Sequence, residues 1–166
     1  MRESKSYGLA RTKDLIRVEV DGVMYALEIQ RMREIVNPLP LIALPRGRAS
    51  VLGVSDYRDE VVAVIDLRRF FGLRPQEPTR RTKWLILESL RGPVAVVVDA
   101  VHEVFSSGSK AQRDVPVLDE HDRERGIKSA CRYQDRLVFL LDVDLVAEPA
   151  MDVRPQEIPF LPSETP

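Results

Sequence analysis

Most of the chain alternates between apolar and polar residues, which is the pattern of β-strands that bury one face. Residues 15–20 alternate in this way, and residues 23–27 read as the returning strand. Between them, Asp21-Gly22 predicts a tight hairpin turn, because two-residue turns need positive φ. Further short strands are predicted over residues 51–54, 61–65, 84–87, 94–98, 100–105, 115–118, 127–133 and 137–141.

Two stretches depart from this alternation. Ile29, Met32 and Val36 follow helical spacing, so we predict a helix over residues 29–36. Residues 73–83 are polar and contain two prolines, and we interpret them as an exposed connection between two β-rich halves.

The spacing of the predicted strands indicates the fold class. About ten short strands, with turns every 8–12 residues or so, are typical of small barrels or a sandwich. We therefore predict a mainly β fold of two small packed barrels over residues 14–148. Residues 1–13 and the proline-rich residues 149–166 are expected to be tails.

The densest cluster of polar residues in the chain lies within residues 51–72. Two apolar runs flank six polar residues, 55–60, and this reads as strand, charged turn and strand. Asp66 follows the second run, and we predict that it caps a short helical turn that ends at Gly72.

Composition narrows the functional classes. The 166 residues are 44% hydrophobic and carry a net charge of −1, which favours a packed domain and argues against nucleic-acid binding. The single cysteine, Cys131, excludes an internal disulfide. No apolar stretch is long enough to span a membrane, and the first residues do not resemble a signal peptide, so we expect a cytoplasmic protein without membrane insertion.

Few residues offer catalytic or metal-binding chemistry. The two histidines, His102 and His121, lie in no recognised motif, and the glycines do not form a phosphate-binding loop. A hydrolase built on the acids of residues 56–66 is a distant alternative, because no sugar-stacking aromatic groove accompanies them. We therefore expect no catalytic activity, no cofactor and no metal.

A second alternative is a small β-barrel that binds RNA. Residues 80–83 are basic, and Trp84 follows them, so a cationic strip beside a stacking aromatic is conceivable. This run is short and is the only one of its kind in the chain, so a solvated loop is the preferred interpretation.

The charged turn itself indicates a binding module. Arg58 has acids on both sides, and Glu34 lies on the polar face of the predicted helix. Since arginine pairs with carboxylates through two parallel hydrogen bonds, Arg58 could hold the turn against that helix. Tyr57 and Arg58 could also be presented to a partner, because both residue types are common interface anchors.

In this context the chain resembles the CheW family, the coupling proteins of bacterial chemosensory arrays, over residues 14–148. Residues 32–35 match the family pattern V-x-E-I as MREI, and residues 43–45 match its proline loop as ALP. Residues 53–68 follow the signature G-x-x-N-L-R-G-x-x-x-P-V-x-D-L-R, residues 96–101 follow V-V-V-D-x-V, and residues 136–141 match the last strand.

This resemblance implies two SH3-like, five-stranded barrels and a non-catalytic adaptor in chemotaxis signal transduction. Its expected partners are the cytoplasmic tip of a methyl-accepting chemoreceptor, bound as a helical hairpin in a groove, and the regulatory domain of a CheA-type histidine kinase. Glu34 and Arg58 are carried over as the pair that shapes the receptor-side surface.

The chain departs from the family pattern at the charged turn. Asp56 stands where the signature has Asn, Tyr57 where it has Leu, and Asp59 where it has Gly. We therefore assign Glu34, Asp56, Tyr57, Arg58 and Asp59 to the receptor-binding turn and its supporting pair. An adaptor that binds only one of receptor or kinase is the alternative within the same fold.

Overall fold

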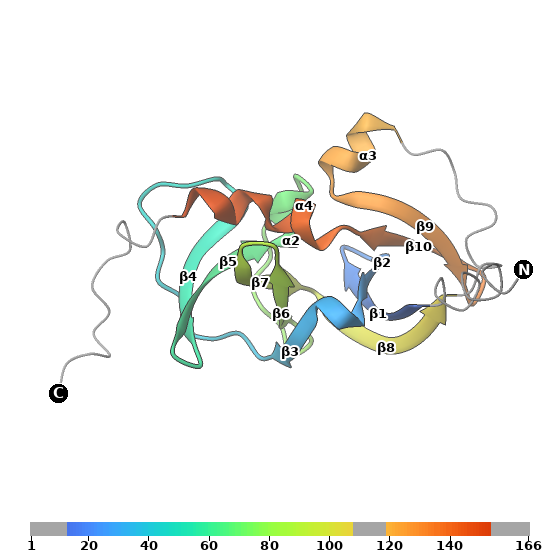
Figure 1. Cartoon of the computed structure of the whole chain (residues 1–166), viewed down its shortest axis with the longest axis horizontal. Helices are drawn as coiled ribbons and strands as arrows, with labels where there is room; N and C mark the ends of the chain where they lie inside the picture. Colours follow the sequence, from blue (N-terminus) through green and yellow to red (C-terminus); the bar gives the residue numbers. More distant parts are fainter. Residues whose placement is uncertain (1–12, 108–118, 154–166) are drawn as a thin grey trace, which may run out of the picture.

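The computed structural model describes residues 13–107 and 119–153, and within them the fold is mainly β (Figure 1). The predicted strand over residues 115–118 and most of both predicted tails lie outside these residues. The strands are β1 (Lys13–Val20), β2 (Val23–Glu28), β3 (Met32–Val36), β4 (Val51–Tyr57), β5 (Glu60–Asp66), β6 (Lys83–Ser89), β7 (Gly92–Val98), β8 (Ala100–Ser107), β9 (Ile127–Tyr133) and β10 (Arg136–Leu141).

The helical elements are short and connect or flank the strands. They are η1 (Ile29–Arg31), α2 (Leu67–Phe70), α3 (Glu120–Glu124), α4 (Val143–Ala147) and η3 (Glu148–Asp152). Asp66 caps α2 as predicted, since its side chain accepts a hydrogen bond from the backbone of Arg68. The predicted C-terminal tail begins at residue 149, but its first residues are helical, because η3 covers residues 148–152.

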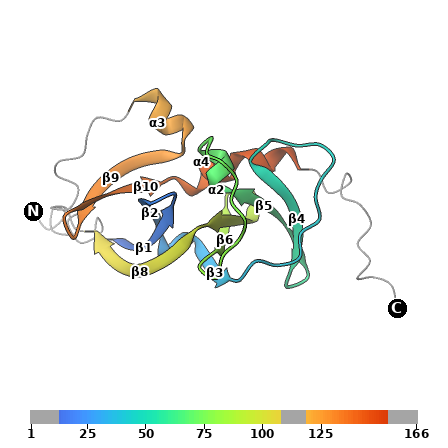
Figure 2. The same ribbon diagram turned by 180° about the vertical axis from the view of Figure 1, so that it is seen from behind.

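The strands form two five-stranded sheets, which confirms the predicted fold class. Sheet A has the order β8-β1-β2-β10-β9, and sheet B has the order β3-β6-β7-β5-β4. Most neighbours are antiparallel, but β10 runs parallel to β2, and β5 runs parallel to β7. The two sheets lie side by side, with α2 and α4 near their junction (Figures 1 and 2).

Within the described residues, the apolar core consists of three clusters, of which one joins the two sheets. One lies in sheet A around Leu15 and Phe105, and one lies in sheet B around Tyr57 and Trp84. The largest joins both sheets and includes Val18. The strand β7 illustrates the arrangement, because Val96 belongs to the shared cluster and its neighbour Ala95 to the cluster of sheet B. Burial on both faces explains the continuous apolar run in β7.

The predicted helix over residues 29–36 is wrong. Only residues 29–31 are helical, as a single 3₁₀ turn, and Met32–Val36 is the strand β3. This strand pairs with β6, and its burial alternates, with Arg33 and Ile35 exposed. The apolar positions of this stretch fit helix and strand equally well, and the pairing with β6 decides between them.

Residues 73–83 do not separate the two sheets. They connect β5 to β6, which both belong to sheet B. The chain instead crosses from sheet A to sheet B at η1, after β2, and returns at Asp99, between β7 and β8. The first two strands therefore complete a sheet with the last three, and this long-range pairing leaves no local signal in the sequence.

Candidate functional site

The charged turn between β4 and β5 is a two-residue hairpin turn. Its central residues, Arg58 and Asp59, both have left-handed backbones, with φ of +47° and +65°. Two-residue turns of this kind match the twist of the strands they join, although asparagine and glycine are the residues that adopt them most easily. The turn thus places the Arg58 side chain outside the end of the hairpin, where it is 70% exposed.

The carboxylate of Glu34, on β3, receives three hydrogen bonds from this hairpin. The Tyr57 hydroxyl donates to Oε1 at 2.6 Å, and Arg58 Nε donates to the same oxygen at 3.0 Å. Arg58 Nη2 donates to Oε2 at 3.1 Å. The predicted pairing of Glu34 with Arg58 is therefore confirmed, but its support is an edge strand and not a helix.

These contacts change the acidity of each group. Hydrogen bonds from Arg58 first, and then from Tyr57, lower the pKa of Glu34 below its usual value. The hydrogen bond to Glu34 raises the pKa of Tyr57, because it stabilises the protonated phenol. The Arg58 guanidinium also lies 5.7 Å from the centre of the Tyr57 ring. At neutral pH the cluster is thus a carboxylate with a phenol and a guanidinium donating to it.

Tyr57 faces inward, so the prediction that this side chain is presented to a partner is wrong. It is only 5% exposed and belongs to the buried cluster of sheet B. The side chains of Asp56 and Asp59 are exposed on either side of it. The charged turn therefore exposes one arginine and three acids, Asp56, Asp59 and Glu60, whereas Tyr57 is buried.

The same contacts bridge the two edges of sheet B. The strands β3 and β4 are the outer strands of this sheet. Glu34 on β3 reaches Tyr57 at the end of β4, and Arg33 on β3 pairs at 2.6 Å with Glu60 at the start of β5. Side chains thus span the opening between the edge strands, so the candidate site is also where the barrel closes.

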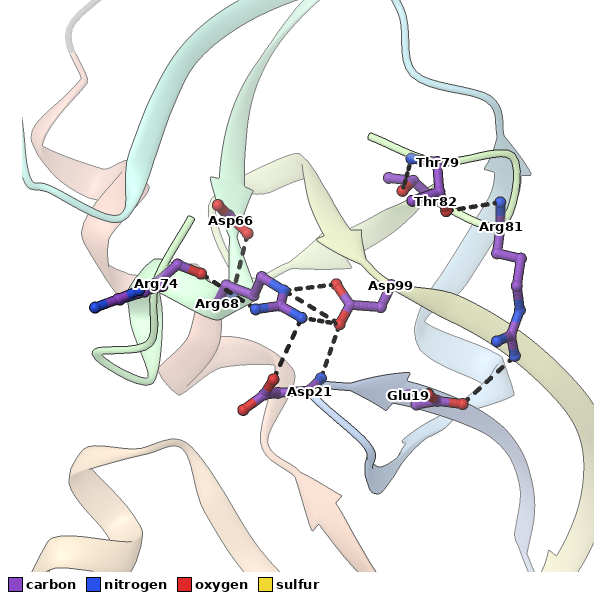
Figure 3. Close-up of polar contacts among 9 residues, drawn as sticks. All are labelled: Glu19, Asp21, Asp66, Arg68, Arg74, Thr79, Arg81, Thr82 and Asp99. Carbon is purple, nitrogen blue, oxygen red and sulfur yellow. Dashed lines mark hydrogen bonds and ion pairs between the residues drawn. The ribbon is translucent and has the colours of Figure 1, made fainter. Parts of the chain in front are cut away.

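A second polar cluster, which the sequence did not indicate, joins the two sheets (Figure 3). Arg68, on α2, donates from Nε and Nη2 to the carboxylate of Asp99, at distances from 2.8 to 3.2 Å. Asp99 also accepts from the backbone of Asp21, in the β1–β2 turn, at 2.8 Å. We call Asp21, Arg68 and Asp99 the inter-sheet cluster.

Within the inter-sheet cluster the Arg68 side chain is the most shielded, at 14% exposed, whereas Asp21 is 54% exposed. Arg68 also donates to the backbone carbonyl of Arg74, which ties the start of the 73–83 connection to α2. Arg68 and Asp99 lie in two separate family-like motifs, 31 residues apart. The sequence therefore offered no sign that they bond to each other, and only the fold brings them together.

A cavity of about 860 Å³ opens beside the inter-sheet cluster. Its lining includes Asp21, Arg68 and Asp99, together with the 75–82 segment and Trp84. Some of the polar groups that line it bond to one another, as Figure 3 shows for Thr79 with Thr82 and for Arg81 with Glu19.

The alternative chemistries find little support in the described residues. Trp84 is 4% exposed, so its ring is not available to stack on an RNA base. Within residues 13–107 and 119–153, no three acidic, histidine or cysteine side chains are grouped as a metal site. In the same part of the chain, none of the helices has the length and apolar character needed to cross a bilayer.

Comparison with known proteins agrees with the geometry. Residues 14–150 match the family described as the CheW-like domain. The chain is 24% identical over 132 residues to the probable chemotaxis protein CheW of Rhizobium etli, covering 80% of this chain and 85% of that protein. It is 29% identical over 122 residues to the chemotaxis protein CheW of Helicobacter pylori, covering 72% of each.

A solved structure has the same fold. It is the scaffolding protein TtCheW from Thermoanaerobacter tengcongensis, with a TM-score of 0.72 and 21% sequence identity. The match covers 81% of this chain and 86% of that one.

Proposed function

The chain belongs to the CheW-like family, and on this premise we propose that it is a non-catalytic adaptor that couples chemoreceptors to a CheA-type histidine kinase. The family match over residues 14–150 is the observation that carries the proposal. The fold supports it, because two barrels that share one core offer separate surfaces to two partners.

The receptor-side surface of this adaptor is the β4–β5 turn with its supporting strand β3. Arg58 is the proposed anchor, because its guanidinium is exposed yet fixed by two hydrogen bonds to Glu34. Arginine is enriched among the residues that dominate binding energy, and a side chain already held in place loses less entropy on binding. Asp56 and Asp59 flank it and define the charge that the receptor tip meets.

The second partner is the kinase regulatory domain, which we place at the exposed edge strands of the barrels. An edge strand presents unpaired backbone groups and is therefore a natural docking surface. The two outer strands of sheet A are β8 and β9, and they lie far in the sequence from the receptor-side turn.

The test is co-sedimentation of the purified chain with a receptor cytoplasmic fragment and a CheA-type kinase. We expect both partners to be retained at micromolar concentrations, and retention of neither would refute the adaptor role. Arg58→Ala should weaken retention of the receptor about tenfold or more. Arg91→Ala is the matched control, because Arg91 is also an exposed arginine in a two-residue hairpin turn, but in the β6–β7 turn, where its backbone N–H donates to Ser89.

A second candidate is an adaptor that has kept only one partner. The observation that favours it is the pair of exposed acids, Asp56 and Asp59, at positions where the family pattern has uncharged residues. The double variant Asp56→Asn/Asp59→Gly removes both charges and leaves the Glu34 contacts in place. Receptor binding that appears only in this variant would support an adaptor that has kept only the kinase, whereas equal receptor binding by both chains would exclude that form.

A further inference from the structure

We propose that Tyr57 is a positioning residue, whose hydroxyl holds the Glu34–Arg58 pair in the one arrangement that the structure shows. This inference rests on the proposed function only in its consequence for receptor binding. The contacts themselves belong to this chain, because the family pattern has leucine at this position and leucine has no hydroxyl to donate.

The first step is the anchoring of the Tyr57 ring. Tyr57 is the last residue of β4, and its ring packs in the buried cluster of sheet B with Val64 and Trp84. Close-packed interiors leave such a ring little freedom. The hydroxyl at its end is therefore delivered to a fixed point at the surface of the barrel.

The second step runs from the hydroxyl to Glu34. At 2.6 Å, the bond from the Tyr57 hydroxyl to Glu34 Oε1 is a short, charge-assisted hydrogen bond. The same oxygen accepts from Arg58 Nε, and the other oxygen accepts from Arg58 Nη2. With Oε1 fixed by Tyr57, the plane of the carboxylate is set, and the guanidinium can meet it through two bonds in only one orientation.

The third step concerns Arg58. Its side chain is long, largely exposed and carried on a hairpin turn, so without Glu34 it would sample many rotamers. The buried phenol thus supplies the rigidity that an exposed arginine lacks. A partner that binds Arg58 therefore contacts a preorganised guanidinium, and its affinity should fall when the Tyr57 hydroxyl no longer orients Glu34.

A competing explanation is that Tyr57 only fills the core of sheet B. Tyr57→Phe separates the two, because it keeps the ring and removes one oxygen. If the hydroxyl positions the pair, NMR titration of Tyr57→Phe should show a Glu34 pKa above that of the parent chain. Hydrogen exchange at Arg58 Nε should become faster as well.

The matched control is Tyr133→Phe. The Tyr133 ring also stacks in an apolar cluster, against Phe105, but its hydroxyl accepts a 3.4 Å hydrogen bond from the neighbouring Gln134, and Tyr133 lies in sheet A, not in the Glu34 site. This variant should leave the Glu34 pKa and the Arg58 exchange unchanged. If Tyr57→Phe behaves in the same way as Tyr133→Phe, Tyr57 is a core residue and the positioning role is refuted.

The consequence for binding is measured with the receptor fragment. We expect Tyr57→Phe to lower the affinity roughly two- to tenfold, the range for releasing one long side chain that binding must then immobilise. Because the NMR measurements need no partner, the two proposals can be refuted separately. If the Glu34 pKa and the Arg58 exchange are unchanged in Tyr57→Phe, the positioning role of Tyr57 is refuted. If both change, but Arg58→Ala leaves the receptor affinity unchanged, the receptor-side assignment is refuted and the positioning role stands.

Discussion

The substitution Gly53→Ala tests why the family-like signature begins with glycine. Gly53 lies in β4 with φ of +151°, and a loop crosses its backbone closely. A Cβ at this position would lie 2.1 Å from the carbonyl oxygen of Ile42 and 2.8 Å from its carbonyl carbon. Both are backbone atoms, so the loop must move away.

The magnitude follows from what that movement breaks. Ile42 and Val54 exchange two backbone hydrogen bonds, of 2.8 and 2.9 Å, next to Gly53. Each such bond contributes about 1 kcal/mol net, and a non-glycine residue held at a φ that only glycine adopts easily adds about 1–3 kcal/mol of strain. We therefore expect Gly53→Ala to lower the free energy of unfolding by roughly 3–5 kcal/mol, which is about 10 °C or more in melting temperature.

The control for the backbone strain alone is Gly22→Ala. Gly22 also has positive φ, at +78°, but no atom would lie within 4 Å of the added Cβ. We expect this variant to lose only about 1–2 kcal/mol. Urea unfolding followed by circular dichroism measures both. Equal losses in the two variants would refute the close approach of Ile42 to Gly53.

Three further outcomes are expected. Arg68→Met should lower the free energy of unfolding by about 2–3 kcal/mol, because it removes charge-assisted bonds from the inter-sheet cluster. The control is Arg69→Met: Arg69 is 41% exposed and pairs with Asp66 at 3.6 Å, so its loss should lower the free energy of unfolding by under about 1 kcal/mol. Equal losses of unfolding free energy for the two variants in urea would contradict the stabilising role of the inter-sheet cluster. The hydrogen bond from Arg31 lowers the pKa of Asp144, so its stabilisation is present above the unfolded pKa of about 3.9 and is lost as pH falls through the folded value. Asp144→Asn should therefore flatten the decline of unfolding free energy on acidification, and an unchanged slope would contradict this. Because Trp84 is only 4% exposed, its fluorescence should be blue-shifted and should resist quenching by iodide. Efficient iodide quenching would contradict the burial of Trp84.

The sequence was sufficient for features that depend on neighbouring residues. The two-residue turn at Asp21-Gly22, the cap at Asp66 and the apolar run of β7 each follow from local backbone preference or from the period of burial. The pairing of Glu34 with Arg58 was also predicted, from the tendency of arginine to pair with carboxylates and from the resemblance to the family.

The local signal was ambiguous where the chain had to choose between periods. Residues 32–36 place apolar side chains at positions that suit either a helix or a strand. Pairing with β6 selects the strand, and this moves Glu34 from a helix face to the edge of sheet B. The direction of Tyr57 was equally undetermined, because tyrosine suits both an interface and a core.

The sequence by itself thus determined most of the strands, but not β3, together with the tight turns and the residues able to pair at the charged turn. The tertiary structure alone decided which strands share a sheet, that Tyr57 lies beneath Glu34, and that Arg68 meets Asp99 across the sheets. The physical reason is range: turn geometry and alternation are set within a few residues, whereas these contacts form only when distant segments bury a common core.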